Sequence, residues 1–149
     1  MRAKPCTTGT RTAVARRALL DTGFVVALVN KADPDHDRCV DVWRELRTQL
    51  LSVEGVLVEA AQLLRRSPGG AAGIVGLVFG AGTELIAITE ERASRAVALM
   101  KKYADVPMDL VDALLVTIAE ERKVHDVLTL DRRGFAAYRV GRERFRLLP

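Results

Sequence analysis

The six residues Ala18-Leu19-Leu20-Asp21-Thr22-Gly23 form the stretch that decides the fold. Three apolar residues in a row are typical of a short buried strand, and the Asp-Thr-Gly that follows ends it. The next apolar run, residues 24–29, has the character of a helix that turns away from the strand. We therefore expect a strand followed by a helix, with Asp21 at the carboxyl end of the strand.

The same alternation of strands and helices continues along the chain. The patterns predict strands near residues 50–53, 83–88 and 124–130, an edge strand over 145–148, and helices from Asp33-Pro34 and over 56–64, 71–79, 89–103 and 108–123. Strands that alternate with helices form a parallel sheet covered by helices. The predicted fold class is therefore α/β with a central, mainly parallel sheet.

Composition and charge narrow the kind of protein. A length of 149 residues with 49% hydrophobic and 28% charged residues is typical of one globular domain. No apolar run approaches the roughly 18–20 residues of a membrane span, and the run that meets Asp21 is too short for a signal peptide. Cys6 and Cys39 lack a CxxC spacing and are interpreted as free thiols. We expect a cytoplasmic protein without membrane association.

The net charge of +4 is unevenly distributed along the chain. Residues 1–17 contain five basic side chains and no acidic one, and residues 132–149 contain six arginines against Glu143, whereas acids outnumber bases in between. We interpret residues 1–17 as a flexible basic extension and residues 18–149 as the folded domain. Basic ends can steer a polyanion toward an acidic centre that a cation neutralises. On charge alone, solvated tails remain the simpler interpretation.

Five acidic side chains fall where such a sheet would bring them together. Asp21 and Asp131 each follow an apolar strand, and ligand sites of parallel sheets lie beyond the carboxyl ends of the strands. Glu59, Asp109 and Asp112 lie near the starts of helices that can face the same edge. Crowded carboxylates repel one another unless a cation neutralises them, and Mg²⁺ or Mn²⁺ prefers oxygen ligands. The spacing therefore predicts a divalent-metal site.

Each acid also has a structural interpretation. Asp21 can cap the following helix, Asp131 can begin a turn, and Asp109 fits the role of a helix cap best. Glu59 and Asp112 are embedded in apolar helical surfaces and must find a partner. Spacing alone leaves both the metal site and the capping roles open.

Four stretches together resemble the PIN-domain ribonucleases, close to the VapC toxins of bacterial toxin–antitoxin pairs. They are residues 19–22, 58–64, 103–113 and 128–135, and their order and separation carry the resemblance from Ala18 to the C-terminus. Gly23, where serine or asparagine is more usual, and the long N-terminal extension depart from the family pattern. The resemblance implies a three-layer α/β sandwich, which agrees with the sheet predicted above.

The resemblance also implies roles for particular residues. It makes Asp21, Glu59, Asp112 and Asp131 the catalytic, metal-binding acids, Asp109 a secondary ligand, and Thr22 and Thr129 supporting hydroxyls. The implied chemistry is hydrolysis of RNA by a water activated at a Mg²⁺ or Mn²⁺ site. The implied partners are RNA, a VapB-like antitoxin and a second copy of the chain in a homodimer.

Two arginines are weaker candidates for RNA binding. Arg132 and Arg133 follow Asp131 directly and can contact phosphate, which would position RNA without selecting its sequence. For either residue alone, a solvated arginine in a turn is an equally good interpretation.

Two other classes of function remain as alternatives. A catalytically silent PIN-like domain would bind RNA or protein, but the presence of all four acids argues against it. A phospho-acceptor receiver domain is also a small parallel α/β sheet with clustered aspartates. A receiver domain requires an acidic pair after the first strand and a lysine after one of the last strands. In this chain Thr22-Gly23 follows Asp21, and arginines follow Asp131.

Overall fold

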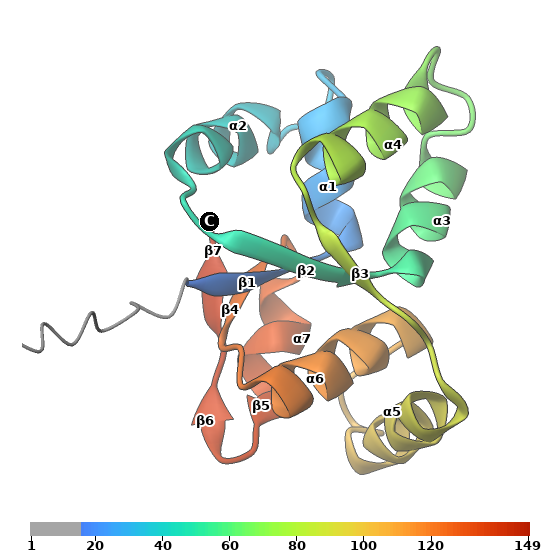
Figure 1. Cartoon of the computed structure of the whole chain (residues 1–149), viewed down its shortest axis with the longest axis vertical. Coiled ribbons are helices and arrows are strands. Elements are labelled where there is room, and N and C mark those ends of the chain that lie inside the picture. Colours follow the sequence, from blue (N-terminus) through green and yellow to red (C-terminus); the bar gives the residue numbers. More distant parts are fainter. Residues whose placement is uncertain (1–15) are drawn as a thin grey trace, which may run out of the picture.

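A computed structural model describes residues 16–149 as a sheet between two groups of helices (Figure 1). One face is covered by α1 (Thr22–Val29), α2 (His36–Glu45), α3 (Glu54–Leu63) and α4 (Gly70–Gly80), and the other by α5 (Glu90–Lys102), α6 (Leu110–Arg122) and α7 (Arg132–Ala137). The predicted three-layer α/β sandwich is confirmed. No helix in the part of the chain described here is long and apolar enough to cross a membrane.

The main sheet contains five parallel strands. They are β1 (Arg17–Leu20), β2 (Gln49–Val53), β3 (Glu84–Ile86), β4 (Asp126–Leu128) and β7 (Arg146–Leu148), in the order β3-β2-β1-β4-β7. The chain thus moves outward from β1 to β3 and then returns to the other side of β1. Ligand sites of such sheets lie at the carboxyl ends of the two strands that flank the reversal, here β1 and β4. This order also differs from the 2-1-3-4-5 order of receiver-type sheets.

Burial explains why these segments become the centre of the fold. Ala18, Leu19 and Leu20 of β1 are fully buried, as expected for a strand covered by helices on both faces. Helix α6 is buried at seven successive positions, residues 113–119, because it packs between the sheet and α5. The first turn of α6, which carries Asp112, is therefore fixed to the core of the domain.

Helix α2 starts later than the sequence predicts. The Asp33 side chain accepts a hydrogen bond from the Asp35 backbone N–H at 2.9 Å, which forms a turn before the helix. The helix then begins at His36, so the prediction of a start at Asp33-Pro34 is wrong by two to three residues. Aspartate followed by proline can begin a turn as well as a helix, and in this chain it begins a turn.

Three other features differ from the predicted outline. Helix α7 and an antiparallel hairpin, β5 (Arg139–Val140) and β6 (Glu143–Arg144), were not predicted, because such short elements carry no measurable periodicity. Strand β1 begins at Arg17, whose guanidinium donates to the Arg122 carbonyl at 2.8 Å, so Arg17 belongs to the fold. Residues 1–15, including Cys6, lie outside the described residues, and their flexibility stays a prediction.

Candidate metal centre

Three of the predicted acids are N-caps of helices. Asp21 Oδ1 accepts a hydrogen bond from the Thr22 backbone N–H at 2.7 Å at the start of α1. Asp109 caps α6 through the Asp112 N–H at 2.8 Å, and Asp131 caps α7 through the Gly134 N–H at 3.0 Å. The positive end of a helix dipole favours a negative charge at each of these positions. The cap predicted for Asp109 is confirmed, and Asp21 and Asp131 are caps as well.

Thr129 joins two of these acids at the carboxyl ends of β1 and β4. Its hydroxyl donates to Asp21 Oδ2 at 2.6 Å and accepts from the Asp131 backbone N–H at 3.0 Å. The Asp21 N–H donates to the Leu128 carbonyl at 3.0 Å, which continues the pairing of the two strands. Asp21 is only 6% exposed. One buried threonine therefore holds the acids that follow both central strands.

A second threonine links helix α3 to the same edge of the sheet. The Thr22 hydroxyl donates to Glu59 Oε2 at 2.6 Å. Thr22 is buried, and Glu59 is half-buried on α3. Because Thr22 follows Asp21 directly, this hydrogen bond brings the Glu59 carboxylate to the end of β1.

The electrostatics of the site are dominated by crowded carboxyl groups. Burial, together with the nearby charges of Asp109, Asp21 and Asp131, raises the pKa of Asp112 to about 8, although a weak hydrogen bond from the Asp109 N–H lowers it. Burial likewise raises the pKa of Asp21 to about 6, although hydrogen bonds from Thr129 and Thr22 lower it. A divalent cation would remove this repulsion.

The acids lie near one another without forming a finished ligand set. Within residues 16–149, no three Asp, Glu, His or Cys side chains are arranged as a ready metal-binding group. Each cap uses one carboxylate oxygen, Asp109 Oδ1 or Asp131 Oδ1, so the second oxygen of each residue lies outside the cap. Both residues are exposed. The donor set therefore fits a hard cation in chemistry and charge.

The two arginines after Asp131 differ in their surroundings. The Arg132 guanidinium donates to an oxygen of the C-terminal residue, Pro149. Arg133 is exposed on the first turn of α7. Arg133 is therefore the better candidate for a phosphate contact.

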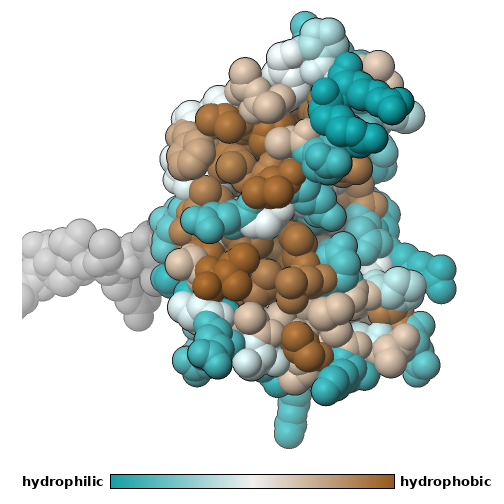
Figure 2. All heavy atoms as spheres, turned by 90° about the vertical axis from the view of Figure 1, so that its right-hand side faces the viewer, coloured by the Kyte–Doolittle hydropathy of each residue, from teal (hydrophilic) through white to brown (hydrophobic). Residues whose placement is uncertain are grey.

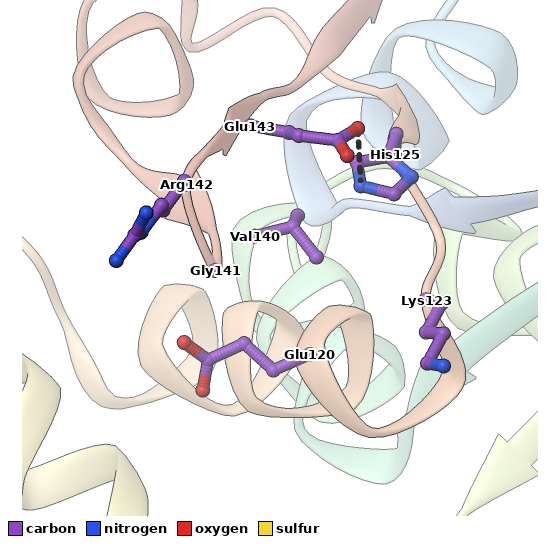
Figure 3. A pocket seen from close by; sticks show the side chains of 7 residues that line it. All are labelled: Glu120, Lys123, His125, Val140, Gly141, Arg142 and Glu143. Carbon is purple, nitrogen blue, oxygen red and sulfur yellow. Dashed lines mark ion pairs between the residues drawn. The ribbon is translucent and has the colours of Figure 1, made fainter.

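A pocket of about 490 Å³ lies away from the acids (Figure 3). It is lined by Glu120, Lys123, His125, Val140, Gly141, Arg142 and Glu143, and the dashed line in Figure 3 marks the 3.1 Å pair between His125 Nε2 and Glu143 Oε2. His125 precedes β4, whereas Thr129 follows it, so the pocket is at the opposite end of the strand. None of the predicted site residues lines it.

Sequence reasoning missed two residues beside the acids, Gly134 and Tyr138. A Cβ added at Gly134 would lie 2.2 Å from Asp131 Oδ2 and 2.9 Å from the Tyr138 hydroxyl. Tyr138 is fully buried, and its hydroxyl donates to the Pro107 carbonyl at 2.7 Å. The sequence offered no signal for either residue, because α7, the short helix that contains Gly134 and ends at Tyr138, was not predicted.

The protein is thus a three-layer α/β domain whose acidic side chains gather where the strand order reverses, between β1 and β4. The PIN domain family matches residues 18–141 of the sequence, and the chain belongs to the PIN-domain family. It is also 30% identical over 146 residues to ribonuclease VapC26 of Mycobacterium tuberculosis, over 88% of this chain and 99% of that protein. The resemblance stated from the sequence is confirmed.

Solved structures share the fold. The crystal structure of Mycobacterium tuberculosis VapC20, described as a sarcin-ricin loop cleaving toxin, has a TM-score of 0.73 at 19% identity, over 83% of this chain and 97% of that one. A toxin–antitoxin complex from Klebsiella pneumoniae has a TM-score of 0.57 at 18% identity, over 80% of this chain and 91% of that one. At this level of identity the two likenesses show the fold.

Thr129→Val is expected to lower the free energy of unfolding by about 1–3 kcal/mol. The valine leaves the buried Asp21 carboxyl without its donor and the Asp131 N–H without its acceptor. The pKa of Asp21 rises further, so the loss should be larger at pH 8 than at pH 5. Urea denaturation at both pH values measures it. Thr129→Ser, which keeps the hydroxyl, is the control, and equal stability of the two variants would contradict the role of Thr129.

Proposed function

We propose that this chain is a metal-dependent endoribonuclease, the toxin of a VapBC-like toxin–antitoxin pair, with residues 18–149 as its nuclease domain. The observation that carries the proposal is the gathering of buried and half-buried carboxyls at the carboxyl ends of β1 and β4, two of them with raised pKa values. Membership of the PIN-domain family and the similarity to a VapC ribonuclease support it.

In this proposal, four acids hold Mg²⁺ or Mn²⁺. They are Asp21, Glu59, Asp112 and Asp131, with Asp109 as a secondary ligand. When bound, such an ion supplies Lewis-acid polarisation of the phosphate and a more acidic water. Thr22 orients Glu59 and Thr129 orients Asp21 through their hydroxyl groups. Without a cation Asp112 holds a proton near neutral pH, so that cation binding releases it.

The proposed substrate is single-stranded or looped RNA, approached through its phosphates. Arg133 is exposed on the first turn of α7, two residues after Asp131, and arginine contacts to phosphate position an RNA without selecting its sequence. A sarcin-ricin loop oligonucleotide is the first substrate to assay, because the VapC20 structure is described as that of a toxin cleaving this loop.

The proposed protein partner is a VapB-like antitoxin that covers an apolar face. Figure 2 shows apolar side chains gathered on the side of the molecule that carries α3, α4 and α5. Val58 and Leu63 of α3 and Phe79 of α4 are 67%, 60% and 58% exposed. Exposed apolar patches of this kind mark interaction surfaces. Val58 adjoins Glu59, so an antitoxin segment with apolar residues followed by a basic one fits both the patch and the acids.

The proposed toxin is also a homodimer and cytoplasmic. Light scattering or native mass spectrometry tests whether a second copy of the chain binds to form a homodimer. Fractionation of cells that express the chain tests the cytoplasmic location.

A catalytically silent PIN-like domain is the second candidate function. The observation that favours it is that residues 16–149 contain no ready group of metal ligands. Such a domain would bind RNA or a protein in the presence of EDTA as well as in its absence, and would leave the RNA uncut.

Chelation by EDTA is expected to stop RNA cleavage, and Mg²⁺ or Mn²⁺ is expected to restore it. The metal should also raise the melting temperature, more strongly at pH 8 than at pH 6. The folded-state pKa values of Asp112 and Asp21 are raised to about 8 and about 6, so the folded chain binds protons more tightly than the unfolded chain. The metal-free chain therefore loses stability as the pH rises from about 4 to 8. A cation restores that stability.

Cleavage assays with and without EDTA, and thermal melts at both pH values with Mn²⁺, measure these effects. Cleavage that persists in EDTA, or an equal shift of the melting temperature at pH 6 and pH 8, would contradict the proposed metal dependence.

A further inference from the structure

A buried tyrosine connects the two segments of chain that carry Asp131 and Asp112. Tyr138 ends α7, where its N–H donates to the Gly134 carbonyl at 3.0 Å. Its hydroxyl donates to the Pro107 carbonyl at 2.7 Å. Pro107 stands two residues before Asp109, the N-cap of α6. One side chain therefore ties the helix capped by Asp131 to the start of the helix that carries Asp112.

The ring of Tyr138 is held firmly in the core. It packs edge-on against Phe135, with ring centroids 5.4 Å apart, and against Tyr103, at 5.2 Å. The residue has 0% exposure. Because aromatic packing fixes the ring, the position of the hydroxyl is fixed as well, and the bond to Pro107 acts as a spacer of constant length.

The same hydroxyl lies beside the carboxyl groups of the candidate metal centre. Burial and the charges of Asp112, Asp131, Asp109 and Asp21 raise the pKa of Tyr138 above its ordinary value. The hydroxyl therefore stays protonated and remains a donor. The hydroxyl and Asp131 Oδ2 both pack against Gly134, since a Cβ added there would lie 2.9 Å from the hydroxyl and 2.2 Å from Asp131 Oδ2.

We propose that Tyr138 is a positioning residue that sets the separation of Asp112 from Asp131 through its hydrogen bond to Pro107. It acts through the backbone of the segment 107–109 and contacts neither cation nor RNA. The inference rests on the proposed function, since it concerns the acids assigned there to the cation. Groups that orient metal ligands typically change metal affinity by about 10–100-fold when they are lost.

The test compares Tyr138→Phe with Tyr103→Phe in the full chain, with Mn²⁺ alone as the probe and no RNA present. Both variants keep an aromatic ring in the same cluster, but Tyr138→Phe alone removes the donor to Pro107. Calorimetric titration should give Mn²⁺ binding about tenfold weaker for Tyr138→Phe and unchanged for Tyr103→Phe. A merely structural hydroxyl would lower the stability of the chain and leave the Mn²⁺ affinity of the folded protein unchanged.

A second variant addresses the case in which Tyr138→Phe folds poorly. Pro107→Gly keeps Tyr138 and loosens the segment that it holds, so it should weaken Mn²⁺ binding in the same direction. Unchanged Mn²⁺ affinity in the folded Tyr138→Phe protein, or in Pro107→Gly where the first variant does not fold, overturns the inference.

The parent chain and Asp112→Asn separate this failure from failure of the proposed function. If the parent binds Mn²⁺ and Asp112→Asn does not, the proposed metal centre stands and only the role of Tyr138 is at stake. If the parent binds no Mn²⁺, the proposed metal centre and the inference both fall.

Discussion

Asp112→Asn is expected to reduce RNA cleavage by more than about 100-fold while the fold stays intact. Loss of a group that only orients a metal ligand already lowers metal affinity or activity by about 10–100-fold, and Asp112 is proposed to be a ligand itself. Burial and three neighbouring carboxylates raise the pKa of Asp112 to about 8. Asparagine removes that charge, and its side-chain oxygen can still accept a hydrogen bond at the start of α6. The metal-free variant should therefore be more stable than the parent, with a larger gain at pH 8 than at pH 5.

Growth inhibition in cells, cleavage of RNA in vitro and thermal melts measure the effect of Asp112→Asn. Asp21→Ala should give the same loss of activity, since Asp21 lies at the end of β1 among the other acids. Asp105→Asn is the matched control, because Asp105 is an exposed acid on the segment that leads into α6. Cleavage by Asp112→Asn at the parental rate would show that the proposed site is wrong.

Gly134→Ala is expected to lower both the activity and the stability of the chain. A Cβ at this position would lie 2.2 Å from Asp131 Oδ2 and 2.9 Å from the Tyr138 hydroxyl, closer than real contacts allow. Asp131 must then leave its place at the start of α7, and the lost cap alone costs about 0.5–2 kcal/mol. The displaced carboxylate should lower the rate of RNA cleavage by about tenfold or more.

Urea denaturation and the cleavage assay measure both effects of Gly134→Ala. Gly76→Ala is the control, because Gly76 lies inside α4 and a Cβ there would meet nothing within 4 Å. That change should stabilise the chain by about 0.5–1 kcal/mol and leave the activity unchanged. Parental stability and activity of Gly134→Ala would contradict the tight packing around Asp131.

The sequence predicts the main elements well where burial is strong on both faces. Strand β1 is recognisable from three apolar residues before Asp21, and α6 from a long apolar helix that is buried at residues 113–119. Prediction fails where an element is short or where two local signals compete. Helix α7 has six residues and strands β5 and β6 have two each, which is too short for a hydrophobic periodicity to be recognised. The pair Asp33-Pro34 is compatible with a turn as well as with the start of a helix.

The acids of the site could be selected from the sequence, and the family resemblance added Thr22 and Thr129 as supporting hydroxyls, but which atoms pair could not be predicted. Asp21 and Asp131 were candidates because each follows an apolar strand. Asp112 was a candidate because a carboxylate on an apolar helical surface must find a partner. The hydrogen bond from Thr129 to Asp21 joins residues that are 108 positions apart, and the one from Tyr138 to Pro107 spans 31. Such pairings depend on which strands become neighbours, and no local pattern encodes that.

The reversal of strand order at β1 also makes the site depend on residues that the ribosome adds far apart. Asp21 precedes Thr129 by 108 positions, and β4 must insert beside β1 before the two side chains meet. A nascent chain that has not yet gained β4 has only one side of the site. Pairing between distant segments is also slow compared with local folding. Helix α1 and its cap Asp21 can therefore form first, and the centre is completed only after β4 has left the ribosome.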